Sequence, residues 1–238
     1  MNYTFDWTVL WREPYGDLIL EGLKMTLYLS LAGWVGALVL GTLVGFGRTA
    51  RVLLVRALCT AYVEVFRNIP ILLQLFFWYF AFPAMLPRDV RVHLYSFGWE
   101  TGAAVVALAI YTSSRVAEHI RSGIRSTESG IRLAALSTGL SRMQAARYVI
   151  APLVFRLIMP SLTSEFLTIF KSSSVAMTIG VAETTFVSQR IGNATFRFIE
   201  ASTEATIIYL GIAGLVAILA GLLELRLRVP GLMHREAN

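Results

Sequence analysis

The residues best placed to do chemistry in this chain are polar side chains embedded in an apolar stretch at 157–181. Five of them recur every three or four residues, which places them on one face of a helix: Ser161, Ser164, Glu165, Thr168 and Ser172. Because a charge at the centre of a bilayer costs at least about 2.5 kcal/mol, Glu165 needs a partner or a water-filled cavity. Such a polar face is a candidate path for a polar solute.

Two cations and one amide could bind the charged groups of a small solute. Arg67 and Lys171 would attract an acidic group, and Gln74 could meet an amine or a carboxylate. Structural alternatives stay open for both cations. Lys171 could anchor its helix to a neighbouring span, and Arg67 follows Glu64 by three residues, the spacing of an ordinary helical ion pair.

The sequence contains no pattern that indicates catalysis or a metal site. His93, His119 and His234 are scattered, and there is neither a Ser/His/Asp set nor a Gly-x-x-x-x-Gly-Lys-Ser/Thr phosphate loop. The lone Cys59 excludes an internal disulfide and a thiolate metal cluster. The sequence therefore predicts a protein that is not an enzyme and has no cofactor of its own.

The elements that must position these residues are membrane helices. The chain is 56% hydrophobic and only 15% charged, with a mean hydropathy of +0.64, values that are unusual for a soluble domain. A span takes about 20 apolar residues, and five stretches approach or reach that length: 25–46, 69–86, 99–120, 153–181 and 205–225. We expect an all-α integral membrane protein, a single domain over 1–238, with an amphipathic helix at 52–66 that ends before Pro70.

The charge distribution predicts the orientation of these spans. The net charge of +6 would suit a nucleic-acid binder, but in a membrane protein basic residues mark the cytoplasmic side. With the N-terminus outside, thirteen cations fall in inside segments and seven in outside segments, with Arg67 at a boundary. We therefore expect the N-terminus out, the C-terminus in and residues 115–156 in the cytoplasm. The acidic start, unlike a signal peptide, predicts that the first span is retained.

Between the third and fourth predicted spans, residues 127–150 have the pattern of a helix-turn-helix. Gly139 suits the left-handed residue that ends a helix, Ser141 and Gln144 form a capping-box pattern, and Pro152 suits the first turn of the next span. Small side chains at Ala134, Ala135 and Gly139 would allow another protein to approach closely. An ordinary cytoplasmic loop is the plain alternative. A DNA-binding helix-turn-helix is disfavoured, because the flanking spans would hold it against the bilayer.

This segment resembles the coupling loop of ABC importer permeases. The pattern of that family is Glu-Ala-Ala, three residues, Gly, nine residues, Ile, one residue and Leu-Pro. It falls here on Leu133, Ala134, Ala135, Gly139, Val149 and Pro152, with Leu133 in place of Glu and Ala151 in place of Leu. Two further stretches, 64–70 and 171–174, look like the polar amino-acid branch. Together with Phe5-Asp6-Trp7 they most resemble glutamate/aspartate permease subunits.

The resemblance implies the fold of a type I ABC importer permease in the bacterial cytoplasmic (inner) membrane. It also implies the partners. These are a second permease in a homo- or heterodimer, two cytoplasmic ABC ATPases that dock on the coupling segment and use ATP and Mg, and an extracytoplasmic solute-binding protein. The alternatives are a secondary transporter or channel, for which we find no internal repeat, and a membrane-embedded enzyme.

Overall fold

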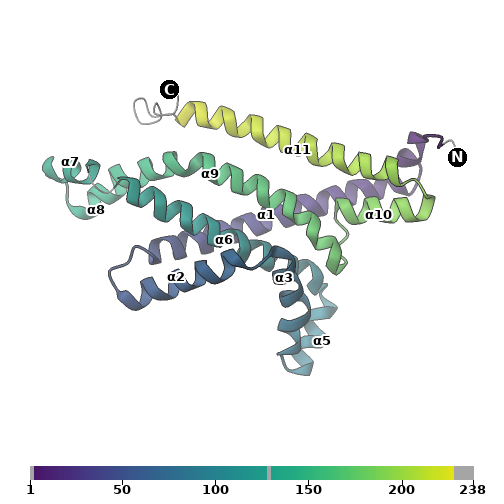
Figure 1. Cartoon of the computed structure of the whole chain (residues 1–238), viewed down its shortest axis with the longest axis horizontal. Helices are drawn as coiled ribbons and strands as arrows, with labels where there is room; N and C mark the ends of the chain where they lie inside the picture. The colour runs from purple at the N-terminus through teal and green to yellow at the C-terminus, as the bar shows by residue number, and fades with distance from the viewer. Residues whose placement is uncertain (1–2, 128–129, 228–238) are drawn as a thin grey trace.

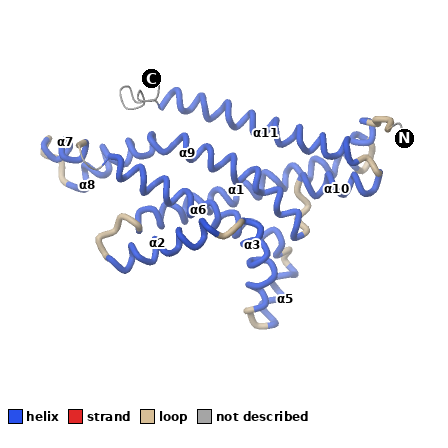
Figure 2. Tube along the Cα trace, viewed as in Figure 1, coloured by secondary structure: helices blue, strands red, loops and turns tan. Residues whose placement is uncertain are grey.

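The computed structural model describes residues 3–127 and 130–227, which contain helices and no strand. Four long helices dominate: α1 (Tyr15–Gly47), α6 (Trp99–Thr127), α9 (Ala151–Ser172) and α11 (Phe198–Leu227). Shorter helices connect them: α2 (Leu53–Asn68), α3 (Ile71–Phe76), α4 (Phe82–Ala84), α5 (Arg88–Ser96), α7 (Ile131–Ser137), α8 (Arg142–Ala145) and α10 (Thr184–Thr195). Short segments of other helix types are also present: 3₁₀ helices at Trp7–Trp11 and Ser173–Ile179, and π-helices at Phe77–Ala81 and Ala146–Ile150. Figure 2 shows how little of the described chain lies in loops.

The core lies where α1 packs along α6. The two helices approach so closely because α1 presents glycines to α6: a Cβ at Gly41 would lie 2.7 Å from the Val116 Cβ, and one at Gly45 would lie 2.9 Å from the Ile120 Cβ. Small residues let membrane helices gain van der Waals contact over a long interface. The α1–α6 pair is therefore the centre against which α2, α9 and α10 pack, while α11 packs on α9 and α10.

The second predicted span, 69–86, does not continue the preceding helix α2 in a straight line. The axes of α2 and the α3–α4 segment differ by 105°, and α3 and α5 leave the direction of the long helices (Figure 1). Pro70 causes the break, because Ile69 before it is held in the extended region at φ −89° and ψ 123°. The predicted amphipathic helix before this break is confirmed as α2.

The fourth predicted span, 153–181, begins earlier than the sequence indicated. Residues Arg142–Ile179 form one helical run of 38 residues that includes α8, a π turn, α9 and a 3₁₀ turn. The π turn ends where the Ala151 N–H bonds the Ala146 carbonyl, immediately before Pro152. Since proline lacks an N–H and crowds the preceding turn, a wider turn lets the helix pass Pro152 instead of starting there. A second π turn precedes Pro83 in the same way.

Length and composition support fewer spans than the five predicted. Within residues 3–127 and 130–227, three helical runs qualify, Tyr15–Gly47, Arg142–Ile179 and Phe198–Leu223, or four if the bent α2–α4 pair is one span. The predicted span 99–120 lies in α6, which is long enough at 29 residues but is not among them. Its polar residues Thr112, Ser113 and Ser114 are buried in the bundle. A central helix surrounded by protein does not need the apolar surface of a lipid-facing one.

Candidate functional site

Glu165 lies in a small charged cluster between α9 and α6. Its Oε1 atom is 3.2 Å from His119 Nε2 and 4.0 Å from Arg115 Nη1. Arg115 in turn donates to the Tyr111 hydroxyl at 2.7 Å. The side chain of Glu165 is only 12% exposed, so the expectation that it needs a partner is confirmed. Sequence reasoning missed His119 and Arg115 as partners of Glu165. They precede Glu165 by 46 and 50 positions in the chain, and no local pattern connects residues so far apart.

Two other hydroxyls of the predicted polar face bond to carbonyls of their own helix. Ser164 donates to the Pro160 carbonyl at 3.2 Å, and Thr168 donates to the Ser164 carbonyl at 2.9 Å. Ser164 is exposed, while Thr168 and Ser172 are half-buried. Because the Ser164 and Thr168 hydroxyls bond within their own helix, they leave the face polar without tying it to a neighbouring helix.

Gln74 and Arg67 are not brought together with Glu165. Gln74 is buried, and its amide donates to the carbonyls of Phe66 at 2.9 Å and Ile69 at 3.1 Å. It closes the sharp bend between α2 and α3, a structural role that the sequence did not indicate. Arg67 is exposed and forms no ion pair with Glu64 in the described part of the chain, so the expected i,i+3 pair is wrong.

Lys171 is exposed at the end of α9 and lines a pocket of about 420 Å³ between α9, α10 and α11. The pocket lining is partly apolar, with Ala205, Leu210 and Ala213, and also includes hydroxyl and amide side chains: Thr185, Ser188, Gln189, Ser202, Thr206 and Tyr209. A cation among neutral hydrogen-bonding groups can hold a carboxylate. Helix α10, which lines this pocket, lies at the end of the molecule opposite α7 and α8 (Figure 1).

A buried glutamate that sequence reasoning missed, Glu183, bonds two residues that line this pocket, Thr185 and Tyr209. Glu183 accepts hydrogen bonds from the backbone N–H groups of Thr185 and Phe186, both at 2.9 Å, and from the Tyr209 hydroxyl at 2.8 Å. It therefore caps α10 and joins it to α11. Glutamate is not among the usual N-cap residues, so the pattern gave no signal.

The helix-turn-helix predicted at 127–150 is confirmed over its described residues; Glu128 and Ser129 lie outside them. Gly139 adopts φ +87° after α7, and its N–H bonds the Leu136 carbonyl at 3.0 Å. The capping box is present: Gln144 N–H donates to Ser141 Oγ at 3.3 Å, and Ser141 N–H donates to Gln144 Oε1 at 2.9 Å. The pair α7–α8 lies at one end of the bundle (Figure 1).

The residues of the coupling pattern were expected to form an exposed surface, and Ala135 is the exception. Leu133 is 65% exposed, and Ala134, Gly139 and Pro152 are also exposed, whereas Val149 is half-buried. Ala135 is only 7% exposed, because it packs inside the helix pair. Apart from Leu133, the exposed residues of this pattern have small side chains, so another protein can lie close to the backbone here.

Comparisons with known proteins agree on one family. Residues 23–229 match the family described as binding-protein-dependent transport system inner membrane component. The chain is 36% identical over 225 residues to the glutamine transport system permease protein GlnP of Escherichia coli strain K12, covering 94% of this chain and 99% of that one. It is 31% identical over 246 residues to the glutamate/aspartate import permease protein GltJ of the same strain, covering 98% and 99%.

Two solved structures show a similar fold. One is an amino acid ABC transporter with histidines, with a TM-score of 0.81, 30% identity and coverage of 94% of this chain and 100% of that chain. The other is the MetNI methionine ABC transporter in an inward-facing conformation, with a TM-score of 0.74, 19% identity and coverage of 92% and 100%. The second likeness concerns the fold alone.

Proposed function

Since this chain belongs to the family of binding-protein-dependent transport system inner membrane components, we propose that it forms the membrane path of an ATP-driven importer for polar amino acids. It is a multi-pass inner-membrane permease subunit of an amino-acid ABC importer. It acts as a transport subunit, and we assign ATP hydrolysis to a partner.

The substrate proposal is a polar amino acid of the glutamine, glutamate and aspartate group. The relative that transports glutamine is 36% identical to this chain and the one that imports glutamate/aspartate is 31% identical. The exposed Lys171 shares its pocket with hydroxyl, amide and apolar side chains, and its charge favours a solute that carries a carboxylate. All three amino acids carry an α-carboxylate, and glutamate and aspartate carry a second one.

The membrane arrangement that we propose has five spans, with the N-terminus outside and the C-terminus inside. In this arrangement α6 is the central span and the α2–α4 pair is a bent one. The excess of arginines in the segments assigned to the inside supports it. It also places α7 and α8 in the cytoplasm and the pocket at Lys171 toward the outside.

The observation that carries the proposal is the continuity of one helix between these two places. The run Arg142–Ile179 begins in the segment that resembles a coupling loop, passes Glu165 in its charged cluster and reaches Lys171. A movement imposed on α8 by an ATPase would be transmitted along this helix. The π turn at Ala146–Ile150 and Pro160 within α9 are the places where it can bend.

We propose the following division of roles. The coupling surface for the ATPase consists of Leu133, Ala134, Gly139, Val149 and Pro152, with Ala135 supporting it from inside. The path includes Ser164, Glu165, Thr168, Lys171 and Ser172 along α9. Arg67, exposed near the end of α2, is kept as a candidate solute contact apart from this face, and Gln74 holds the α2–α3 bend. A second permease, two ATPases and a solute-binding protein complete the transporter.

The test is purification of the chain with its co-expressed ATPase and partner permease, followed by reconstitution in proteoliposomes. We expect a complex of two permeases and two ATPases that takes up one or more of glutamine, glutamate and aspartate only with ATP and the solute-binding protein. Uptake by the permease without an ATPase would contradict the proposal and indicate a secondary transporter.

A further inference from the structure

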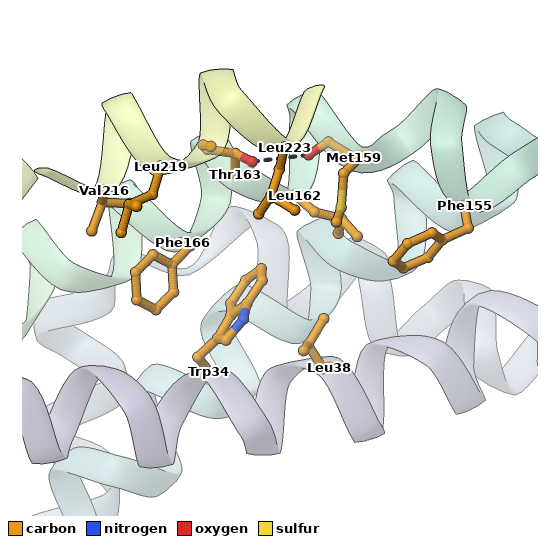
Figure 3. A pocket seen from close by; sticks show the side chains of 11 residues that line it. Trp34, Leu38, Phe155, Met159, Leu162, Thr163, Phe166, Val216, Leu219 and Leu223 are labelled. Carbon is orange, nitrogen blue, oxygen red and sulfur yellow. Dashed lines mark hydrogen bonds between the residues drawn. The ribbon is translucent and has the colours of Figure 1, made fainter. Parts of the chain in front are cut away.

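An apolar groove of about 620 Å³ lies between α1, α6 and the α8–α9 helix, near α7. A second groove of about 360 Å³ adjoins it between α1, α9 and α11, and the two share Leu38, Phe155 and Leu162. Figure 3 shows the second groove, with Trp34 and Leu38 pointing from α1 toward the side chains of α9 and α11. We call the two grooves together the apolar trough.

The trough has a charged end. The first groove is lined by Arg51, Arg132 and Arg142 beside Thr49, and no carboxylate is among the described residues that line it. Neither Arg51 nor Arg142 forms an ion pair with a carboxylate of the described residues, whereas the neighbouring Arg48 is bound to Glu118. Both Arg51 and Arg142 are exposed. An anion of suitable shape can therefore reach them.

We propose that the trough binds an anionic phospholipid of the inner leaflet. Its acyl chains lie along the apolar lining, and its phosphate lies among Arg51, Arg132 and Arg142. Guanidinium groups bind phosphate oxygens in bidentate geometry, and basic clusters at the cytoplasmic end of membrane helices favour anionic headgroups. The inference rests on the proposed function for one point only, the cytoplasmic location of α7 and α8.

A lipid fits the trough better than a protein helix does. Leu219 of α11 lines the second groove and is 52% exposed, and its neighbours Leu215, Ile218 and Leu222 are also more than half exposed, so this side of the trough is open and apolar. The polar groups gather at one end, as the headgroup of a lipid requires. Because Arg132 and Arg142 belong to α7–α8, the bound phosphate would also help to fix the position of the coupling segment.

The test uses the full chain purified in detergent and offered equal amounts of dioleoylphosphatidylglycerol and dioleoylphosphatidylcholine. Native mass spectrometry measures which lipid is retained. Each arginine near an anionic surface contributes a factor of about five in affinity, so we expect the wild-type chain to prefer phosphatidylglycerol at least about fivefold. Arg51→Ala/Arg142→Ala should lose this preference, and Arg51→Lys/Arg142→Lys should keep most of it.

Two further variants make the result specific. Arg88→Ala/Arg190→Ala removes two exposed arginines outside the trough and should bind phosphatidylglycerol as the wild-type chain does. Leu38→Trp, where the grooves meet, fills the trough without changing charge and should lower retention even if the arginine variants fold poorly.

Three results would overturn the inference: equal retention of the two lipids, unchanged retention in the Arg51→Ala/Arg142→Ala variant, or a photo-cross-linker at residue 38 that captures a second permease instead of lipid. No ATPase is present in this assay. A failure of ATP-driven uptake would therefore count against the proposed function and leave the lipid site untouched.

Discussion

At the scale of single residues, the contact between Glu165 and His119 ties α9 to α6 inside the bundle. We expect Glu165→Ala and His119→Ala each to destabilise the chain, and the double variant to be less destabilised than the sum. The coupling energy should be about 0.5–1.5 kcal/mol, in the lower part of the usual range because the His119 side chain is 31% exposed. Thermal unfolding of the detergent-purified chain measures it.

The matched control for this cycle is Ser164→Ala. Ser164 neighbours Glu165, but its hydroxyl bonds only the Pro160 carbonyl of its own helix. Ser164→Ala and His119→Ala should therefore be additive. A coupling energy of zero between Glu165 and His119 would mean that their contact does not contribute to the folded state.

Lys171 is the residue whose charge we expect to act on the solute. Lys171→Ala should lower the kcat/KM of ATP-driven uptake about tenfold or more, because a charge-assisted hydrogen bond contributes about 1.5–3 kcal/mol. Assembly and basal ATPase activity should stay close to wild type, since the side chain is exposed. Uptake of a radiolabelled amino acid into proteoliposomes measures the effect.

The chain offers one other lysine as a control. Lys24 is exposed on α1, outside the residues that line the Lys171 pocket, and Lys24→Ala should leave uptake unchanged. If the Lys171→Ala variant takes up the amino acid as well as the Lys24→Ala variant does, Lys171 is not part of the path.

At the scale of elements, the close contact of α1 and α6 depends on the absence of side chains. Gly41→Val would place a Cβ 2.7 Å from Val116 and 2.9 Å from the Ser113 carbonyl. Overpacking of this kind costs about 1–3 kcal/mol, so we expect a clear fall in thermal stability. Gly211→Val makes the same change in α11, where no atom lies within 4 Å, and should have little effect; similar losses in both variants would show that helix propensity alone is responsible.

The α7–α8 pair can be tested without disturbing its turn. Substitutions at Gly139 would strain its φ of +87°, so the exposed Ala134 is the better site. Ala134→Trp adds a large side chain to the proposed docking surface and should lower co-purification of the ATPase by roughly tenfold, because a tightly packed contact has no room for an indole ring. Ala194 is also exposed, on α10, and the Ala194→Trp variant should co-purify with the ATPase as the wild-type chain does. Normal recovery of the ATPase with Ala134→Trp would contradict docking at this surface.

Elements whose signals are local could be predicted, and elements that depend on distant contacts could not. The turn at Gly139 and the capping box of Ser141 and Gln144 follow from residues within a few positions of each other, and both are present. His119 and Arg115 lie on another helix from Glu165, so only the folded chain reveals them. The position of α6 is a related case. Whether a helix of moderate hydropathy faces lipid or protein depends on its neighbours.

At the scale of the whole molecule, the two proposed sites lie at opposite ends of the bundle. The coupling surface is at α7–α8, the Lys171 pocket is beside α10, and the run Arg142–Ile179 connects them. This arrangement has a direct physical consequence. An ATPase and an incoming solute can act on the same helix only if its two ends lie on opposite sides of the membrane.

Cysteine labelling tests this consequence. In a Cys59→Ala background, the only native cysteine is removed, and single cysteines can replace Met143, which is 77% exposed on α8, and Asn193, which is exposed on α10. A membrane-impermeant maleimide added to intact spheroplasts should label Asn193→Cys and should label Met143→Cys only after permeabilisation. Permeabilised samples of both variants control for reactivity. The reverse pattern would place α7–α8 outside the cell, where no ATP is available, and labelling of both from outside would mean that this helix does not cross the membrane; either result would exclude ATPase coupling through this segment.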